Sequence, residues 1–258
     1  MTGFLKCYHS VCWFIVFLVF GLIICSEGLF AQQPTVYELL KRLDANLIAE
    51  NRIATATMII HGRRGSRSVQ LKSWVQGMDK SFSEYLAPAR EKGTKMLKRE
   101  DQLWIYTPQS DRIIKIAGHM LRQSLMGSDL SYEDMLEDPH LANLYQGKII
   151  GTDTINGRSC WVLELTSREE NVAYRKRKMW VDQERYIALR EERFAKSGKL
   201  LKTTEIKTVF QIDDRWYPKR IIFRDVLSKG VGTELIINAI EFDADIPEYL
   251  FTKAALRK

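Results

Sequence analysis

The 258-residue sequence is poor in cysteine, so cross-links contribute little to its fold. Of its four cysteines, Cys7, Cys12 and Cys25 lie in an apolar N-terminal region, and Cys160 alone lies beyond it. One cysteine cannot close an intramolecular disulfide, so side-chain packing has to hold the fold together. A chain of this length can bury a sizeable core, either as one large β domain or as two small domains.

The sequence also lacks the common motifs of hydrolases and metal sites. No G-x-S-x-G nucleophile elbow occurs, and His61, His119 and His140 have neither an i, i+4 partner nor a neighbouring C-x-x-C. A Cys160–His140 dyad is one alternative, and so is an unrecognised hydrolase that uses an acidic cluster. Cys160 lies in the apolar stretch "SCWVLEL", where a buried, unreactive thiol is the ordinary interpretation. We expect no enzyme activity, no cofactor and no metal.

Only one apolar run is long, and it lies near the start of the chain. Lys6 precedes it, it extends from Val11 to Cys25, and "SEGLFA" follows, ending at Ala31. The run of about fifteen residues is shorter than the roughly twenty that a membrane-spanning helix needs. The pattern predicts a secretory signal peptide at 1–31 and an exported domain at 32–258.

Charge of neither sign dominates, since 39 basic and 32 acidic residues leave a net charge of +7. Local basic clusters occur at Arg63, Arg64 and Arg67 and at 175–178. An exported protein seldom meets nucleic acid, so we expect no nucleic-acid partner. The phosphates of a membrane surface or of a lipid are one interpretation of this charge, and a solvated surface is the other.

A helix is predicted at the beginning of the domain. The sequence "TVYE" is a capping box, with Thr35 as the N-cap and Glu38 three residues later. Apolar residues then recur at helical spacing: Val36, Leu39, Leu40, Leu43 and Leu47. This stripe predicts an amphipathic helix that packs on another part of the domain.

Most of the remaining sequence is typical of strands. Segments such as "RIATATMIIHG" and "RSVQLKSWVQG" are β-branched or alternate between apolar and polar residues. Turn sequences such as "NG", "KSGK" and "IDDR" separate them. We therefore predict a mainly β (α+β) protein, with about eleven antiparallel strands in one sheet that curves toward a half-barrel. No linker or repeat divides it, so a single domain is predicted.

Some strands, such as "LWIYTP" and "SCWVLEL", are apolar on both faces. In a sheet that curves around an apolar cavity, this second apolar face would line the cavity. The central strands of an ordinary core show the same pattern. The sequence does not tell which face lines a cavity. The candidate cavity residues are Val69, Leu71, Trp74, Phe82, Tyr85, Trp104, Tyr106, Trp161, Leu163 and Trp180.

An acidic stretch, "LMGSDLSYEDMLEDPHL", interrupts the strands at Leu125 to Leu141. If Ser131 is an N-cap, Asp134 is the third helical residue and its carboxylate reaches back to the Ser131 N–H. Glu133 then lies in the first turn, where the helix dipole favours negative charge. The sequence therefore predicts a helix that begins at Ser131 and ends before Pro139.

Asp129 has no role in this predicted helix. It follows the flexible Gly127, and it can form an ion pair with an arginine or accept a hydrogen bond from the backbone of a turn. A divalent cation bound by Asp129, Glu133 and Asp134 is an alternative, although no calcium-loop spacing is present.

Two stretches resemble a known family. "LWIYTPQSDRIIKI" and "MGSDLSYEDM" are similar to sequences of bacterial outer-membrane lipoprotein-sorting proteins, a branch of the LolA/LolB-like carriers of the periplasm. The resemblance implies an unclosed barrel that holds acyl chains, with helices over its mouth. Its second stretch then becomes a motif on this lid, made of Gly127, Ser128, Asp129, Ser131, Tyr132, Glu133 and Asp134.

The family's role implies a periplasmic protein that carries lipids or lipoproteins toward the outer membrane. Some members work beside inner-membrane transporters of the resistance-nodulation-division type, and contact with the membrane surface is expected. A sensor or scaffold of the same fold, which binds a membrane-protein partner, remains the alternative.

Overall fold

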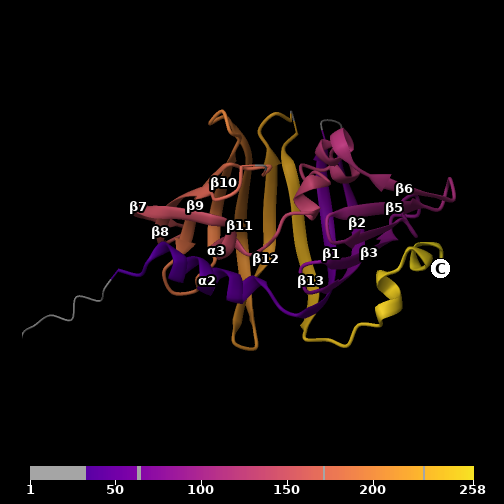
Figure 1. Ribbon diagram of the computed structural model, residues 1–258, viewed down its shortest axis with the longest axis horizontal. Coiled ribbons are helices and arrows are strands. Elements are labelled where there is room, and N and C mark those ends of the chain that lie inside the picture. The colour runs from indigo at the N-terminus through magenta and orange to yellow at the C-terminus, as the bar shows by residue number, and fades with distance from the viewer. Residues whose placement is uncertain (1–32, 63–64, 171, 229) are drawn as a thin grey trace, which may run out of the picture. The chain divides into compact units, whose positions relative to one another are not determined.

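The computed structural model describes residues 33–62, 65–170, 172–228 and 230–258, and it forms one compact unit from Thr35 to Lys258 (Figure 1). The predicted signal peptide, residues 1–31, lies outside the described residues. Within the described ranges, no helix combines the length and the hydropathy that crossing a bilayer requires.

The predicted first helix is confirmed as α2, Val36–Leu47. The Thr35 hydroxyl accepts a hydrogen bond from the Glu38 N–H at 3.3 Å, and the Glu38 carboxylate accepts one from the Thr35 N–H at 2.8 Å. Both halves of the capping box are therefore present, and they satisfy N–H groups that a helix start leaves unpaired. The buried stripe includes Leu39, Leu40 and Leu43.

One antiparallel sheet contains all the named strands, in the spatial order β6-β5-β4-β3-β2-β1-β13-β12-β11-β10-β9-β8-β7. The strands are β1 Asn51–Gly62, β2 Gly65–Gln76, β3 Lys80–Ala87, β4 Lys95–Arg99, β5 Gln102–Thr107, β6 Arg112–Ile116, β7 Tyr145–Ile155, β8 Arg158–Ser167, β9 Lys176–Asp182, β10 Ala188–Phe194, β11 Leu200–Ile212, β12 Arg215–Asp225 and β13 Gly232–Phe242.

The fold class is as predicted, but the described residues form thirteen strands rather than about eleven. Some of the thirteen strands are short. β4 and β6, for example, have only five residues each. The "NG" turn is confirmed between β7 and β8, where Asn156 and Gly157 have φ values of 51° and 76°. These positive values are typical of a two-residue hairpin turn.

The first and last strands, β1 and β13, pair in the middle of the sheet, so β6 and β7 become its two edges. The chain between these edges, residues 117–144, is called here the mid-chain segment. It contains the 3-10 helices η1 Gly118–Arg122, η2 Leu125–Gly127 and η3 Glu133–Met135 and the short helix α3 Leu141–Leu144. Because it joins opposite edges, this segment runs across one face of the sheet (Figure 1).

We call this face, which α2 also covers, the inner face. Leu125 and Leu130 of the mid-chain segment pack there on Met96 and Leu103, and α2 packs on β8 and β9. The outer face is covered in part by the C-terminal 3-10 helices η4 Glu248–Phe251 and η5 Lys253–Arg257.

Candidate functional site

The ten predicted cavity residues lie on both faces of the sheet. Val69, Leu71 and Tyr85 pack on the inner face beside Met126 of the mid-chain segment. Trp161 and Leu163 pack there with α2. The other five lie in clusters on the outer face: Trp74, Phe82, Trp104 and Tyr106 beside the C-terminal 3-10 helices, and Trp180 beside Cys160. The structure does not bring the ten together around one pocket, so their role in ligand binding stays a prediction.

The helix predicted from Ser131 is not formed. The chain makes one 3-10 turn, η3, and the Ser131 hydroxyl does not cap it. Half of the predicted capping box remains, because the Asp134 carboxylate accepts hydrogen bonds from the Ser131 N–H at 2.7 Å and from its hydroxyl at 2.8 Å. Such a short helix is marginal by itself. Contacts of Asp134 and Glu137 with the sheet set the backbone instead.

Asp129 attaches the mid-chain segment to the centre of the sheet. Its buried carboxylate accepts hydrogen bonds from the Thr233 hydroxyl at 2.7 Å and from the Asp225 N–H at 3.0 Å. The Asp129 N–H in turn donates to the Thr233 oxygen at 2.9 Å. A hydrogen bond to backbone is present, but it comes from Asp225 of β12 rather than from the predicted turn after Gly127, and none of the ion pairs among the described residues involves Asp129.

Three cations lie side by side on the inner face. The register pairs Arg193 of β10 with Arg177 of β9 on one side and with Lys202 of β11 on the other. We call these three residues the cation row. Like charges directly opposite one another destabilise a sheet, so the row requires carboxylates close to it.

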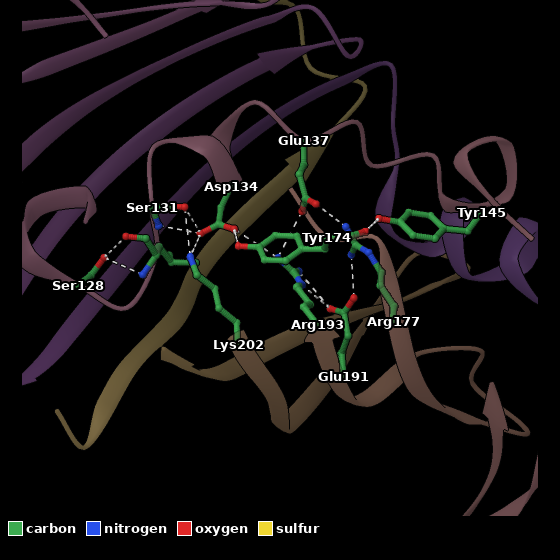
Figure 2. Close-up of polar contacts among 11 residues, drawn as sticks. Ser128, Ser131, Asp134, Glu137, Tyr145, Tyr174, Arg177, Glu191, Arg193 and Lys202 are labelled. Carbon is green, nitrogen blue, oxygen red and sulfur yellow. Dashed lines mark hydrogen bonds and ion pairs between the residues drawn. The ribbon is translucent and has the colours of Figure 1, made fainter. Parts of the chain in front are cut away.

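Two of these carboxylates come from the mid-chain segment (Figure 2). Asp134 forms an ion pair with Lys202, accepts a hydrogen bond from the Tyr174 hydroxyl at 2.6 Å and lies 3.5 Å from a guanidinium nitrogen of Arg193. Glu137 forms an ion pair with Arg177 and accepts a hydrogen bond from Arg193 at 3.3 Å. The row therefore holds the segment to the sheet.

The third carboxylate belongs to the sheet itself. Glu191 of β10 accepts hydrogen bonds from Arg177 at 2.7 Å and from Arg193 at 3.1 Å (Figure 2). We call the cation row and its three carboxylates, Asp134, Glu137 and Glu191, the charged cluster. Two tyrosines stack on it: the Tyr145 ring centroid lies 4.8 Å from the Arg177 guanidinium carbon, and the Tyr174 centroid lies 5.2 Å from that of Arg193. Cations stack favourably on aromatic faces at such distances.

The three carboxylates differ in pKa. Burial alone would raise the pKa of Glu191, but the charges of Arg193 and Arg177 outweigh it and lower the pKa to about 2. Burial opposes ionisation of Asp134 too, and Lys202 more than offsets it, so that pKa is lowered. For Glu137 burial prevails over the two arginines, and the pKa is raised. Glu137 is thus the carboxylate of the cluster that ionises with most difficulty.

A pocket of about 290 Å³ lies beneath the mid-chain segment. Its polar lining includes Asp134, Glu137 and Arg177. Its apolar lining comes from α2 and from strands of the inner face, and includes Leu43, Leu47, Met179, Ile206, Ile221 and Phe223. The volume is at the small end of the range of ligand sites. A long acyl chain therefore fits only if the segment moves away from the sheet.

The alternatives that rely on Cys160, His140 or a metal find no support in the geometry. Cys160 is fully buried, and burial raises its thiol pKa to about 11. The His140 ring bonds to Asp138 at 2.9 Å in the mid-chain segment. Asp129 and Asp134 bond to different partners, and in the described part of the chain no cluster of three His, Cys, Asp or Glu residues is placed to hold a metal ion.

The sequence pattern does not reveal most of the charged cluster. In the sequence, residues 175–178 form one basic cluster, but strand alternation divides it. Arg177 is 4% exposed on the inner face, while Lys178 lies over the Trp180 ring on the outer face. The pattern held a clue, because Arg177 is in phase with the buried Met179 and Val181. A charged residue in an apolar phase predicts a buried ion pair.

A family model described only as "Uncharacterized protein" matches residues 77–258, which is more than half of the chain. The chain belongs to this uncharacterised family. No curated protein matches the sequence.

Three solved structures resemble this one closely. A putative outer membrane lipoprotein-sorting protein domain from Vibrio parahaemolyticus is 26% identical, with a TM-score of 0.74 over 86% of this chain and 98% of that one. A DUF1329 family protein from Desulfovibrio piger has 24% identity, a TM-score of 0.77 and coverage of 85% and 97%. A LolA superfamily protein from Nitrosomonas europaea is 23% identical, with a TM-score of 0.71 over 86% of this chain and 100% of that one. The predicted resemblance to LolA-like and lipoprotein-sorting proteins is confirmed.

Proposed function

We propose that this protein is a periplasmic carrier that holds an acyl chain in the pocket beneath the mid-chain segment. The observation that supports this most directly is the pocket itself, a space between α2, the mid-chain segment and strands β9 to β12 that has apolar walls beside its charged residues. Burial of apolar surface contributes about 0.8 kcal/mol per methylene, so a single chain provides micromolar binding without any catalytic group.

The mid-chain segment is suited to act as the lid of this pocket. It is attached by hydrogen bonds and ion pairs of Asp129, Asp134 and Glu137, and these polar groups find new partners in water when the segment moves away. Leu125 and Leu130 near one end of the segment and Leu141 near the other pack in apolar clusters, so the part that opens is the one around Asp134 and Glu137. The likeness to a lipoprotein-sorting domain agrees with this role.

Export and membrane contact belong to the same proposal. Residues 1–31 serve as the signal peptide, and the mature chain acts between two membranes. At the β12–β13 hairpin, Val226, Leu227 and Val231 are 48%, 59% and 67% exposed. An aliphatic hairpin tip on a basic protein is suited to contact an anionic bilayer surface. A transporter in the inner membrane is also a suitable partner for such a carrier.

The carrier role is tested by native mass spectrometry of the protein purified from the periplasm without detergent. We expect an adduct with the mass of an acyl lipid. Thr204→Trp places a large ring in the pocket and should abolish the adduct, whereas Thr203→Trp, on the neighbouring residue of the opposite face, should keep it. An adduct that persists in a folded Thr204→Trp variant would refute the proposed site.

A further inference from the structure

We propose that the pocket is selective for amphiphiles with an anionic head group, a carboxylate or a phosphate, which pairs with the cation row once the mid-chain segment moves away. This inference rests on the proposed acyl-chain pocket and adds the chemical class of its ligand.

The first support is the charge balance of the cluster. With the segment in place, three cations meet three carboxylates. Asp134 and Glu137 leave with the segment, and Glu191 alone stays on the sheet. The cluster residues left on the sheet, Arg177, Arg193, Lys202 and Glu191, then carry a net charge of +2 beside an apolar surface, and Asp225 offsets part of it at the Lys202 end of the row. This excess of positive charge attracts a ligand that supplies negative charge, and the attraction is strengthened by the low-dielectric apolar surface beside it.

The second support is the geometry of the donors. Arg177 and Arg193 are adjacent across β9 and β10, and two neighbouring guanidinium groups match the oxygens of a carboxylate or phosphate. In addition, the Nε–H of Arg177 is buried and has no hydrogen-bond acceptor among the described residues. Buried donors are seldom left without a partner, and a ligand oxygen would satisfy this one.

The third support is the place of the row relative to the apolar surface. Arg177 and Met179 both line the pocket, on the same face of β9. In the register, Glu191 of β10 is flanked by Met179 of β9 on one side and by Thr204 of β11 on the other. The charged and apolar parts are therefore consecutive along the strands. This order suits a ligand with a charged head and an apolar tail.

Isothermal titration of soluble C12 amphiphiles below their critical micelle concentrations tests this selectivity. The probes are dodecyl phosphate, dodecanoate, a dodecyl tetraethylene glycol ether, dodecyltrimethylammonium and inorganic phosphate. A charge-assisted hydrogen bond to a buried group predicts that both anionic probes bind about tenfold more tightly than the neutral ether. The cationic probe should bind more weakly than the ether.

Two double variants locate the source of the selectivity. Asp134→Asn with Lys202→Gln keeps the cluster neutral when the segment is closed but halves the net charge, from +2 to +1, of the cluster residues that stay on the sheet. The preference for anionic over neutral probes should fall to about threefold, the square root of the tenfold preference. Glu205→Gln with Lys207→Gln removes an ion pair from the same strand outside the cluster and should leave the preference unchanged.

The outcomes separate this inference from the proposed function. If the ether binds as tightly as dodecyl phosphate, the selectivity is refuted while the acyl pocket stands. If inorganic phosphate binds as tightly as dodecyl phosphate, the site is a simple anion site, and the proposal that it binds amphiphiles is refuted. If no C12 probe binds the folded wild-type protein, the acyl pocket and the inference both fail.

Discussion

Asp129 is the residue that ties the mid-chain segment to the middle of the sheet, through two hydrogen bonds to β12 and β13. Replacing it with alanine leaves the Asp225 N–H and the Thr233 hydroxyl without their charged acceptor. We expect Asp129→Ala to lower the free energy of unfolding by about 2 to 3 kcal/mol in urea titrations.

Thr233→Val supplies the matched change on the other side of this contact. In a double-mutant cycle, Asp129→Ala and Thr233→Val should show a coupling of about 1 kcal/mol or more. Strict additivity of the two changes would mean that the Asp129–Thr233 contact does not stabilise the protein.

Glu191 gives the cluster a dependence on pH. Its pKa is lowered to about 2 from an ordinary 4.5, so its stabilising effect is complete above 4.5 and is lost as the pH falls toward 2. The loss is on the order of 3 kcal/mol. Glu191→Gln should be less stable than the wild type at neutral pH and should lose less stability on acidification. Equal slopes of unfolding free energy against pH would contradict the assignment.

At the scale of elements, the mid-chain segment owes its conformation to the sheet rather than to its own sequence. The start of α2 was predictable because Thr35 and Glu38 cap each other locally. The helix expected from Ser131 is not formed, because Asp134 and Glu137 bond to residues of β9, β10 and β11 that are forty or more positions away. Local rules carry no information about such partners.

Glu137→Gln tests whether these ion pairs keep the segment closed. The change weakens the attachment to Arg177 and Arg193, so amide hydrogens of residues 117–144 should exchange faster. Neutral and anionic amphiphiles should both bind roughly fivefold more tightly, because opening costs about 1 kcal/mol less.

Glu133→Gln is the control for this test. It also removes one negative charge from the mid-chain segment, but Glu133 forms no ion pair with a described residue. It should change neither exchange nor affinity. Unchanged exchange in Glu137→Gln would show that the segment is held by other contacts.

At the scale of the whole molecule, the strand sequence and the turns predicted the sheet well, because alternation and turn chemistry are local. The pairing of β1 with β13 could not be predicted from local patterns, since it joins the first and last strands of the domain. That pairing creates the edges β6 and β7, and these force the mid-chain segment across the inner face. The site under the segment is thus a product of topology, which explains why residue patterns did not locate it.

The exposed β12–β13 hairpin predicts how the molecule meets a bilayer. Leu227→Asp with Val231→Asp should reduce co-sedimentation with vesicles of phosphatidylethanolamine and phosphatidylglycerol by about tenfold or more, because each change removes apolar burial and adds repulsion. Tyr249→Asp, at an exposed residue of η4, should have little effect. Equal losses in both variants would indicate non-specific charge effects.

The central claim is that acyl chains lie beneath the mid-chain segment, and photo-crosslinking with a diazirine-labelled fatty acid tests it most directly. Peptide mapping should find the label on pocket residues of β9, β11 and β12, such as Met179, Ile206 and Phe223. Unlabelled fatty acid should compete with it, and Thr204→Trp should prevent it. Label concentrated on the outer face, around Trp74 and Trp104, would contradict the account.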